Sequence, residues 1–297
     1  AAHSSSSSAS LFPRSDPEQT INTCRTDFAE NIIARTKADR FKKEPKTRNF
    51  AFLTHGMARV PFVVSNKESL ILLEEQLGNG EKFGVSISYQ AQESPDGIPS
   101  AINLAKSFAN GEDIWVSLGD NFIFGSRIKE LYEEVNNSNK ATIFIKHVGN
   151  IYGFGSAEIS DGKIKNLEEK PKSNKSGWAV TGLYKLPNAI FDLIPTIKPS
   201  KRKETEIIDI LNLFLLSKNL DFQIFGRGVT WVDCGTVEDL KLANDFVHNY
   251  QKINNTLICS PEEIAYNLNL ISKEKVLSNF KHTSNSDYYL NLTNVLD

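Results

Sequence analysis

The feature that most constrains the fold is a regular alternation of strand-like and helix-like segments that starts near residue 60. Short apolar runs such as "PFVVS" and "IWVSL" are typical of buried strands, and they alternate with longer segments whose apolar residues recur at helical spacing. One of these, residues 67–80, carries Leu70, Leu73 and Leu77 and closes at Gly78, a common residue at the end of a helix. The alternation predicts an α/β fold with a mostly parallel, Rossmann-like mixed sheet flanked by helices.

The rest of the chain divides into similar elements. Further strands are expected at 85–92, 114–118, 141–148, 179–186 and, as a pair, within 222–235, with a hairpin around Asp161-Gly162. Helices are expected at 98–111, 127–137, 205–219 and 236–252, and another begins at Ser260-Pro261. Residues 1–59 have a Ser-rich start, a charged stretch and no steady period, so we expect an atypical segment there and one domain at 60–297.

Composition excludes several classes of function. The 34 basic residues nearly balance the 36 acidic residues, so the chain lacks the positive field that nucleic-acid binding requires. Cys24, Cys234 and Cys259 are far apart and form no CxxC, which argues against a disulfide framework or a zinc site and favours a cytoplasmic protein. No stretch reaches the roughly 20 apolar residues that a bilayer requires, so we expect no membrane partner.

Two acids end apolar strands. In "IWVSLGDN" the strand is followed by Asp120, and "TWVDCGT" repeats the pattern with Asp233. Ligands of doubly wound sheets bind at the carboxyl ends of the strands, and Mg²⁺ takes one or two protein carboxylates there while phosphates complete its shell. The alternative reading is that each Asp caps the next turn. The sequence does not show whether the two acids are near each other.

Two other segments carry candidate binding residues. "QAQESPDG" is either an ordinary turn or a loop in which Gln92 and the backbone around Gly97 face a nucleobase. Taken alone, "LEEKP" is better explained as a solvated charged turn; together with "KRKETEIIDI" it offers Lys170 and Arg202 as candidates for binding a phosphate.

Eight short motifs occur in an order that points to one family. They are "SPDG", "LGDN", "YG", "EEKP", "VTGLY", "RKETEIIDI", "GRGVTWVDCGT" and "CSPEEIAY". With these motifs, the chain from about Val60 to its last residue resembles bacterial glucose-1-phosphate thymidylyltransferases, which are sugar nucleotidyltransferases.

The resemblance implies a fold, a reaction and a site. The fold would be that of the nucleotide-diphospho-sugar transferases, with a small antiparallel sugar-binding part and C-terminal helices. The reaction would join dTTP and glucose-1-phosphate into dTDP-glucose, a precursor of dTDP-rhamnose, and release pyrophosphate. The assembly would be a homotetramer. By the resemblance, the ligands of Mg²⁺ are Asp120 and Asp233, and the catalytic residues are these two acids and Lys170. The implied nucleotide contacts are Gln92, Pro95, Gly97 and Asp120. The implied sugar-phosphate contacts are Asn121, Tyr152, Gly153, Glu169, Lys170, Val180 and Arg202.

The chain departs from this family at its start. The family begins with a central strand, a G-G-x-G-T-R loop and a downstream Lys that wrap the triphosphate, and residues 1–59 contain none of them. Their loss would remove charge stabilisation and leave the middle of the sheet unpaired. The start without Met suggests a frameshifted or misassembled coding region; a transit peptide and a non-catalytic relative are the alternatives. Smaller departures are Ile151, Pro99, Ser100, Lys203 and Thr205.

Three function classes follow. The first is a nucleotidyltransferase, with activity in question because of the absent loop. The second is a non-catalytic protein that binds sugar nucleotides. The third, a dinucleotide-dependent oxidoreductase, requires a G-x-G-x-x-G turn after the first strand, and the sequence has none.

Overall fold

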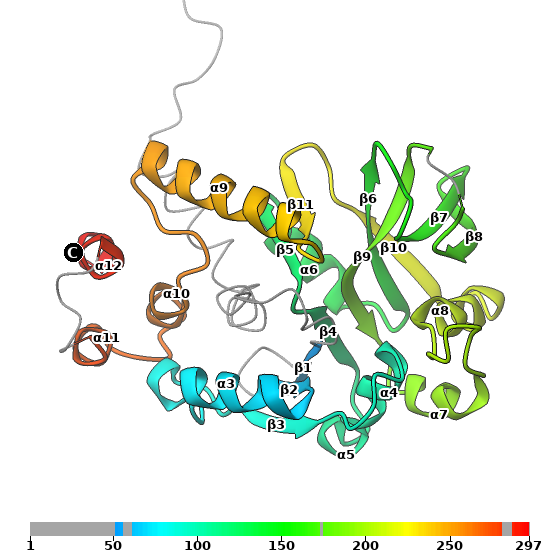
Figure 1. Ribbon diagram of the computed structural model, residues 1–297, viewed down its shortest axis with the longest axis horizontal. Helices are drawn as coiled ribbons and strands as arrows, with labels where there is room; N and C mark the ends of the chain where they lie inside the picture. Colours follow the sequence, from blue (N-terminus) through cyan, green and yellow to red (C-terminus); the bar gives the residue numbers. More distant parts are fainter. Residues whose placement is uncertain (1–50, 56–60, 173–174, 281–286, 297) are drawn as a thin grey trace, which may run out of the picture.

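A mixed β-sheet forms the centre of the molecule (Figure 1). The computed structural model describes residues 51–55, 61–172, 175–280 and 287–296. Within these ranges, nine strands pair in the order β10-β6-β9-β4-β1-β2-β3, with β7 joined to β8 and β9. The strands of this sheet are β1 (Ala51–His55), β2 (Pro61–Ser65), β3 (Ser88–Ala91), β4 (Ile114–Leu118), β6 (Ala141–Val148), β7 (Gly155–Ser160), β8 (Lys163–Glu169), β9 (Gly177–Leu186) and β10 (Leu220–Ile224). A smaller sheet pairs β5 (Asn121–Gly125) with β11 (Val229–Asp233).

The α/β architecture is confirmed, and the sheet is mixed, but the described strands include fewer parallel pairs than expected. Parallel pairing occurs between β10 and β6 and between β2 and β3. β9 runs antiparallel to both β4 and β6, and β1 runs antiparallel to both β2 and β4. The hairpin expected around Asp161-Gly162 is present as β7 and β8. The alternation of elements identified the fold class but not the direction of each strand.

The middle of the sheet is occupied. β1 lies between β2 and β4, with Ala51 opposite both Val64 and Leu118. The expected gap at the centre of the sheet is therefore wrong for the backbone, although β1 falls within the segment predicted to be atypical. Two neighbouring strands with open edges present donors and acceptors that a short extended segment can satisfy in either direction. Residues 1–50 and 56–59, the rest of that segment, lie outside the described residues.

Helices cover both faces of the sheet. The helical elements are α3 (Lys67–Leu77), η1 (Glu81–Phe83), α4 (Ile98–Asn103), α5 (Lys106–Ala109), α6 (Ile128–Asn136), α7 (Ile190–Leu193), η2 (Ile194–Thr196), α8 (Ile207–Leu216), α9 (Val237–Asn254), α10 (Pro261–Asn267), α11 (Lys273–Ser278) and α12 (Asp287–Leu296). The segment 98–111, expected as one helix, breaks after Asn103 into α4 and α5. Where a helix was expected after Ser260, α10 begins, and the Ser260 hydroxyl accepts a hydrogen bond from the Glu263 N–H.

Side-chain alternation along the central strands builds two cores. In β4, Ile114 and Val116 join the large core that includes α4, α7 and α8, whereas Trp115 joins the core beneath α6. β6 repeats the pattern with Ile143 and Phe144. Successive side chains of a strand point to opposite faces, so both faces of these strands are buried.

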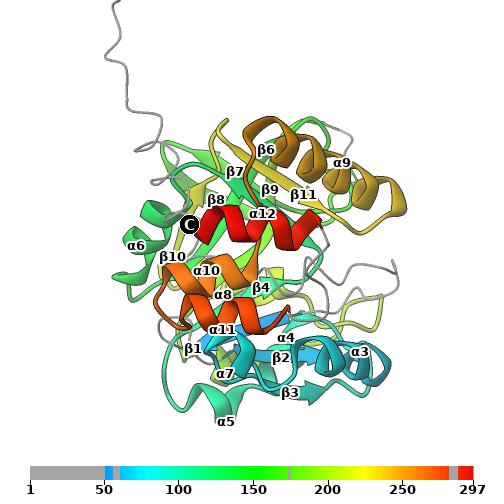
Figure 2. The ribbon, with the colours of Figure 1, turned by 90° about the vertical axis from the view of Figure 1, so that its left-hand side faces the viewer.

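The C-terminal helices form a separate layer. α10, α11 and α12 lie together beside α9, and they pack around a cluster that contains Leu257, Val276 and Leu292 (Figure 2). α9 packs on the small sheet through Ala243 and its neighbours. No helix within the described residues is both long and apolar enough to cross a membrane.

Candidate functional site

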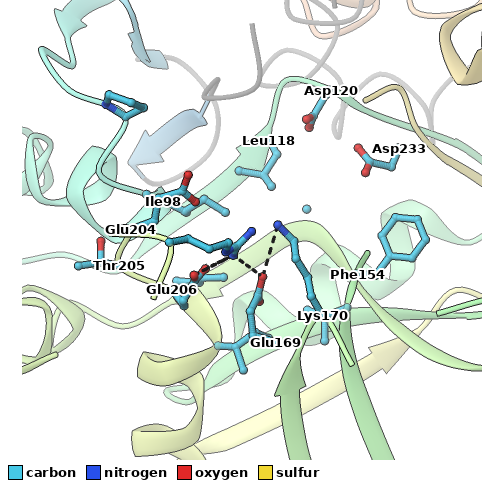
Figure 3. Close-up of a pocket in the computed structure, with 18 of the residues that line it drawn as sticks. Ile98, Leu118, Asp120, Phe154, Glu169, Lys170, Glu204, Thr205, Glu206 and Asp233 are labelled. Carbon is cyan, nitrogen blue, oxygen red and sulfur yellow. Dashed lines mark hydrogen bonds and ion pairs between the residues drawn. The ribbon is translucent and has the colours of Figure 1, made fainter. Parts of the chain in front are cut away.

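A pocket of about 570 Å³ opens where several strands end (Figure 3). Its walls include the residues at or just after the carboxyl ends of β3, β4, β8 and β11, together with the 202–208 segment that leads into α8. Eleven of the twelve residues singled out in the sequence line it: Gln92, Pro95, Gly97, Asp120, Asn121, Gly153, Glu169, Lys170, Val180, Arg202 and Asp233. Tyr152 is not among the lining residues, because its side chain is 64% exposed and only its neighbour Gly153 reaches the wall.

The two aspartates predicted from the strand ends lie side by side. β5 and β11 pair so that Asp233 is opposite Asn121, and the Cys234 N–H donates to the Asp120 carbonyl at 2.7 Å. Their carboxylates lie at one end of the pocket, and the Lys170 side chain extends toward them (Figure 3). Sequence analysis left open whether Asp120 and Asp233 meet, and the pairing of β5 with β11 brings them together.

Asn121 holds Asp120 in place. The Asn121 Nδ2 donates to the Asp120 Oδ1 at 2.9 Å, while its Oδ1 accepts from the Trp231 Nε1 at 2.6 Å and the Gly182 N–H at 2.9 Å. Asn121 is only 4% exposed, and a Cβ added at Gly182 would lie 2.6 Å from its Nδ2, so only glycine fits there. The amide of Asn121 is therefore largely engaged within the protein, and it orients a carboxylate.

A charged cluster forms the opposite wall. The Arg202 Nη2 donates to both Glu206 oxygens, at 2.7 and 2.8 Å, and to the Glu169 Oε1 at 3.1 Å. The Lys170 Nζ lies 3.8 Å from the same Glu169 oxygen. Arg202 was predicted to grip a phosphate, and the structure shows its guanidinium already bonded to two glutamates. Burial raises the pKa of Glu169, and the charge of Glu206 raises it further, although Lys170 and Arg202 oppose the shift.

Lys170 is placed by an unusual backbone turn. It follows the last residue of β8 with φ of +46°, a left-handed conformation that costs a non-glycine residue roughly 1–3 kcal/mol. Its N–H donates to the Phe154 carbonyl at 3.1 Å, which fixes the turn between β8 and the segment before β7. The side chain consequently points into the pocket (Figure 3).

Tyr184 is a site residue that sequence analysis did not identify. Its position in β9 gives the apolar pattern of a core strand, and its side chain is 3% exposed, but it also lines the pocket. Burial raises the pKa of its phenol far above the usual value, and the charges of Glu169, Asp120 and Asp233 raise it further. The phenol therefore stays protonated among three carboxylates. Trp231 was also missed; the signal was its place two residues before Asp233 on the same strand.

The loop after β3 presents a buried amide. The Gln92 N–H donates to the Ser65 carbonyl at 2.9 Å, and its Nε2 donates to the Gly97 carbonyl at 3.2 Å. Its Oε1 is buried and accepts no hydrogen bond from the described residues. A buried acceptor left without a donor costs about 1–3 kcal/mol, so this atom is suited to a ligand N–H. Gly97 has φ of +101°, which favours glycine at this turn.

The pocket walls are acidic. The described lining carries six carboxylates, from Glu93, Asp120, Glu169, Glu204, Glu206 and Asp233, and two cations, from Lys170 and Arg202. No group of three or more His, Cys, Asp or Glu suited to a metal occurs among the described residues. The pair Asp120 and Asp233 offers hard carboxylate oxygens, which fits Mg²⁺ when water and phosphate oxygens supply its remaining ligands.

Comparisons with known proteins identify the family of the chain. A family model described as nucleotidyl transferase matches residues 50–250. The chain is similar to a glucose-1-phosphate thymidylyltransferase of Neisseria meningitidis, with 38% identity over 216 residues that cover 72% of this chain and 75% of the relative. A relative of the same name from Neisseria gonorrhoeae is 35% identical over 76% of this chain and 79% of its own.

Solved structures show the same fold. One, described as a glucose-1-phosphate thymidylyltransferase of Bacillus anthracis in complex with sucrose, superposes with a TM-score of 0.57 and 34% identity over 62% of this chain and 74% of its own. Another, UDP-glucose pyrophosphorylase complexed with UDP-glucose, gives a TM-score of 0.55 and 25% identity over 65% of this chain and 81% of its own.

Proposed function

Because the chain belongs to the nucleotidyl transferase family, we propose that it transfers a thymidylyl group from dTTP to glucose-1-phosphate. A phosphate oxygen of glucose-1-phosphate attacks the α-phosphorus of dTTP, and the bond from that phosphorus to the bridging oxygen of pyrophosphate breaks. The products are dTDP-glucose and pyrophosphate. The observation that carries this proposal is the convergence on one pocket of eleven of the twelve residues that the resemblance selected.

The nucleotide side of the site lies along the loop after β3. Gln92, Pro95 and Gly97 would contact the base, and the Gln92 Oε1, which lacks a donor within the described chain, would accept the N3–H of thymine. The bond from the Gln92 Nε2 to the Gly97 carbonyl fixes which amide atom remains for the base. This orientation favours a base with a ring N–H, such as thymine or uracil, over cytosine, whose N3 is an acceptor.

The sugar-phosphate side lies against β8, β9 and the Arg202 segment. Glu169 would accept hydrogen bonds from sugar hydroxyls, and Val180 and the backbone around Tyr152 and Gly153 would line the ring. Lys170, which extends toward Asp120 and Asp233, would hold the attacking phosphate near the α-phosphorus (Figure 3). The contribution of these residues is positioning and charge neutralisation, which dominate catalysis of phosphoryl chemistry.

Asp120 and Asp233 would hold Mg²⁺. When bound, this ion neutralises phosphate charge as pyrophosphate leaves. Asn121 fixes the Asp120 carboxylate through the hydrogen bond at 2.9 Å, and Trp231 in turn fixes Asn121. Because the described wall carries six carboxylates and two cations, such an ion would strengthen the binding of a triphosphate.

The test measures pyrophosphate release by the full chain from dTTP and glucose-1-phosphate with Mg²⁺, and identifies dTDP-glucose by chromatography. Turnover that depends on both substrates supports the proposal. Binding of dTDP-glucose without turnover would instead identify a non-catalytic sugar-nucleotide-binding protein. Failure of both would contradict the assignment of the pocket.

The same assay with UTP tests a second candidate. The similarity to UDP-glucose pyrophosphorylase favours uridylyl transfer as the alternative, because uracil carries the same N3–H as thymine. Comparison of kcat/KM for dTTP and UTP decides between them, and a higher value for UTP would replace the thymidylyl assignment.

The cellular setting extends the proposal. We propose residues 60–297, with β1 (Ala51–His55) as a central strand added to them, as the nucleotidyltransferase unit, and a cytoplasmic homotetramer as its working form. Light scattering of the purified chain tests the tetramer, and the mass of a monomer would contradict it.

A further inference from the structure

Two loops on different sides of the pocket are joined by hydrogen bonds. The Thr205 N–H and Oγ1 both donate to the Asp96 carbonyl, at 2.8 and 2.7 Å. The Ser100 Oγ lies 3.3 Å from the Thr205 Oγ1 and donates to the same carbonyl at 3.4 Å. The bonds between Asp96 and Thr205 connect residues 109 positions apart in the chain.

The contact is close enough to fix one backbone against the other. A Cβ added at Gly97 would lie 2.1 Å from the Thr205 carbonyl oxygen, so the two backbones touch there without an intervening side chain. The Thr205 hydroxyl is directed to Asp96, and Thr205 lies on the opposite side of the pocket from Asp120 and Asp233 (Figure 3). The hydroxyl therefore acts on the loops rather than on the metal end of the site.

The loop that contains Thr205 is rigid on its other side. The Ser200 N–H donates to the Glu204 carbonyl at 2.8 Å, and the Ser200 Oγ donates to the Glu206 Oε1 at 2.7 Å. Glu206 in turn holds Arg202. A displacement of Thr205 would move Glu206 and Arg202 with it.

We propose that Thr205, supported by Ser100, is a positioning residue that sets the separation between the nucleotide loop at 92–97 and the sugar-phosphate loop at 200–206. The inference rests on the proposed function, because it takes the two loops as the two halves of one substrate site. Its consequence is selective: a ligand that spans both loops depends on the link, and a ligand that touches one loop does not.

Sequence analysis noted Ser100 and Thr205 as departures from the family, and Thr205 lines the pocket. The structure places the two departures in contact, 3.3 Å apart. Together they form a bond between the loops.

Calorimetric titration of the full chain with dTDP-glucose, which spans both loops, and with dTMP, which occupies the nucleotide side, tests the link. Loss of one hydrogen bond in Thr205→Val should weaken dTDP-glucose binding roughly three- to tenfold and dTMP binding less than about twofold. Thr205→Ser keeps the hydroxyl and should restore both affinities. Thr205→Val combined with Ser100→Ala should lose no more than Thr205→Val alone, because the Ser100 hydroxyl acts through the same link.

Thr196→Val is the matched control. Its hydroxyl donates to the Leu193 carbonyl at 2.7 Å on the exposed surface, away from the pocket lining. This variant should leave both affinities unchanged. Equal weakening of dTDP-glucose and dTMP by Thr205→Val, or no weakening of either, would overturn the proposal.

Hydrogen exchange provides a ligand-free readout. Peptides that cover residues 92–101 should exchange faster in Thr205→Val than in the unaltered chain, and unchanged exchange would also overturn the link. If the unaltered chain binds neither ligand, the proposed function fails, and the exchange result alone then decides whether the loops are linked.

Discussion

Asp233 is the last residue of β11, Asp120 directly precedes the paired strand β5, and each is anchored by its neighbours. The Asn121 amide bonds Asp120, and the register of β5 and β11 sets Asp233 opposite Asn121. Asp233 is held by backbone pairing, which does not depend on its charge, so removing that charge without changing the side-chain volume should leave the fold intact. The two acids are therefore suited to conservative substitution that separates chemistry from stability.

At this scale we predict that Asp233→Asn lowers the rate of pyrophosphate release by about 100-fold or more, the usual effect of removing one charge-stabilising group from a site. The melting temperature should change little. Asp221→Asn is the matched control, because Asp221 pairs with Lys140 on the surface at 3.3 Å and such pairs contribute little. Equal rates for Asp233→Asn and the unaltered chain would remove Asp233 from the proposed site.

Glu169 gives a second prediction at the residue scale, concerning pH. Burial and Glu206 raise its pKa above the usual 4.5, so the folded state binds this proton more tightly than the unfolded state. By linkage, stability is then lost as pH rises from 4.5 through the raised pKa. Glu169→Gln removes the titrating group and with it this loss of stability. The difference in melting temperature, variant minus unaltered chain, should therefore be more positive at pH 7 than at pH 4.5. Calorimetry at both values checks the sign, and the opposite order would contradict the burial argument.

Among the elements, the small β5–β11 sheet organises the site more than any single helix. β9 approaches it at Gly182, where a Cβ would lie 2.6 Å from the Asn121 Nδ2 and 2.8 Å from the Leu118 Cβ. The closeness of β9 to β5 holds Asn121 against Trp231 and Asp120. Any added atom at this contact must push the Asn121 amide away.

Gly182→Ala should therefore lower kcat at least about tenfold, with an overpacking cost of roughly 1–3 kcal/mol in the free energy of unfolding. Gly149→Ala is the control, because a Cβ added there meets nothing within 4 Å. Pyrophosphate release and urea unfolding measure the two effects. Full activity in Gly182→Ala would show that the Asn121 contact does not govern Asp120.

The elements also show how far sequence patterns reach. The strand at 114–118 and the helix start at Ser260 are found as predicted, because apolar runs and capping residues are local signals. The strands within 222–235 pair with β6 and β5 rather than with each other, since pairing depends on distant partners. The residues around 103–106 contain no Gly or Pro to mark the break between α4 and α5.

For the site too, local signals were predicted and features that depend on distant residues were not. Asp120 and Asp233 were visible because each ends an apolar run, but their adjacency depends on β5, which was not expected as a strand. Tyr184 and Trp231 carry the apolar pattern of core strands, so their roles became visible only with the pocket. The ion pair of Arg202 with Glu206 depends on the conformation of the loop between them, and no sequence pattern predicts that conformation.

For the whole molecule, the balance of charge in the pocket is the governing quantity. The described lining carries more carboxylates than cations, and both substrates are polyanions. The walls alone would repel a triphosphate. A divalent cation held by Asp120 and Asp233 would neutralise those two carboxylates, at the end of the pocket where the phosphates would lie.

We accordingly predict that EDTA reduces pyrophosphate release to the background rate and that excess Mg²⁺ restores it. Because Asn121 holds the Asp120 carboxylate and the pairing of β11 with β5 places Asp233 without an ion, circular dichroism should not change during this treatment. Binding of dTTP, measured by calorimetry, should weaken at least about tenfold without Mg²⁺. Undiminished turnover in EDTA would contradict the metal assignment.

Before any substrate binds, Arg202 is already paired with Glu206 through two short hydrogen bonds. Within the described residues these contacts use only the Arg202 Nη2, so an arriving phosphate can bind the Nη1 and Nε donors while it competes with Glu206 and Glu169 for the charge of the guanidinium. A dianion competes better in this exchange than a monoanion. The carboxylates that already surround Arg202 thus favour phosphate over weaker anions, because the more highly charged ligand competes with them better.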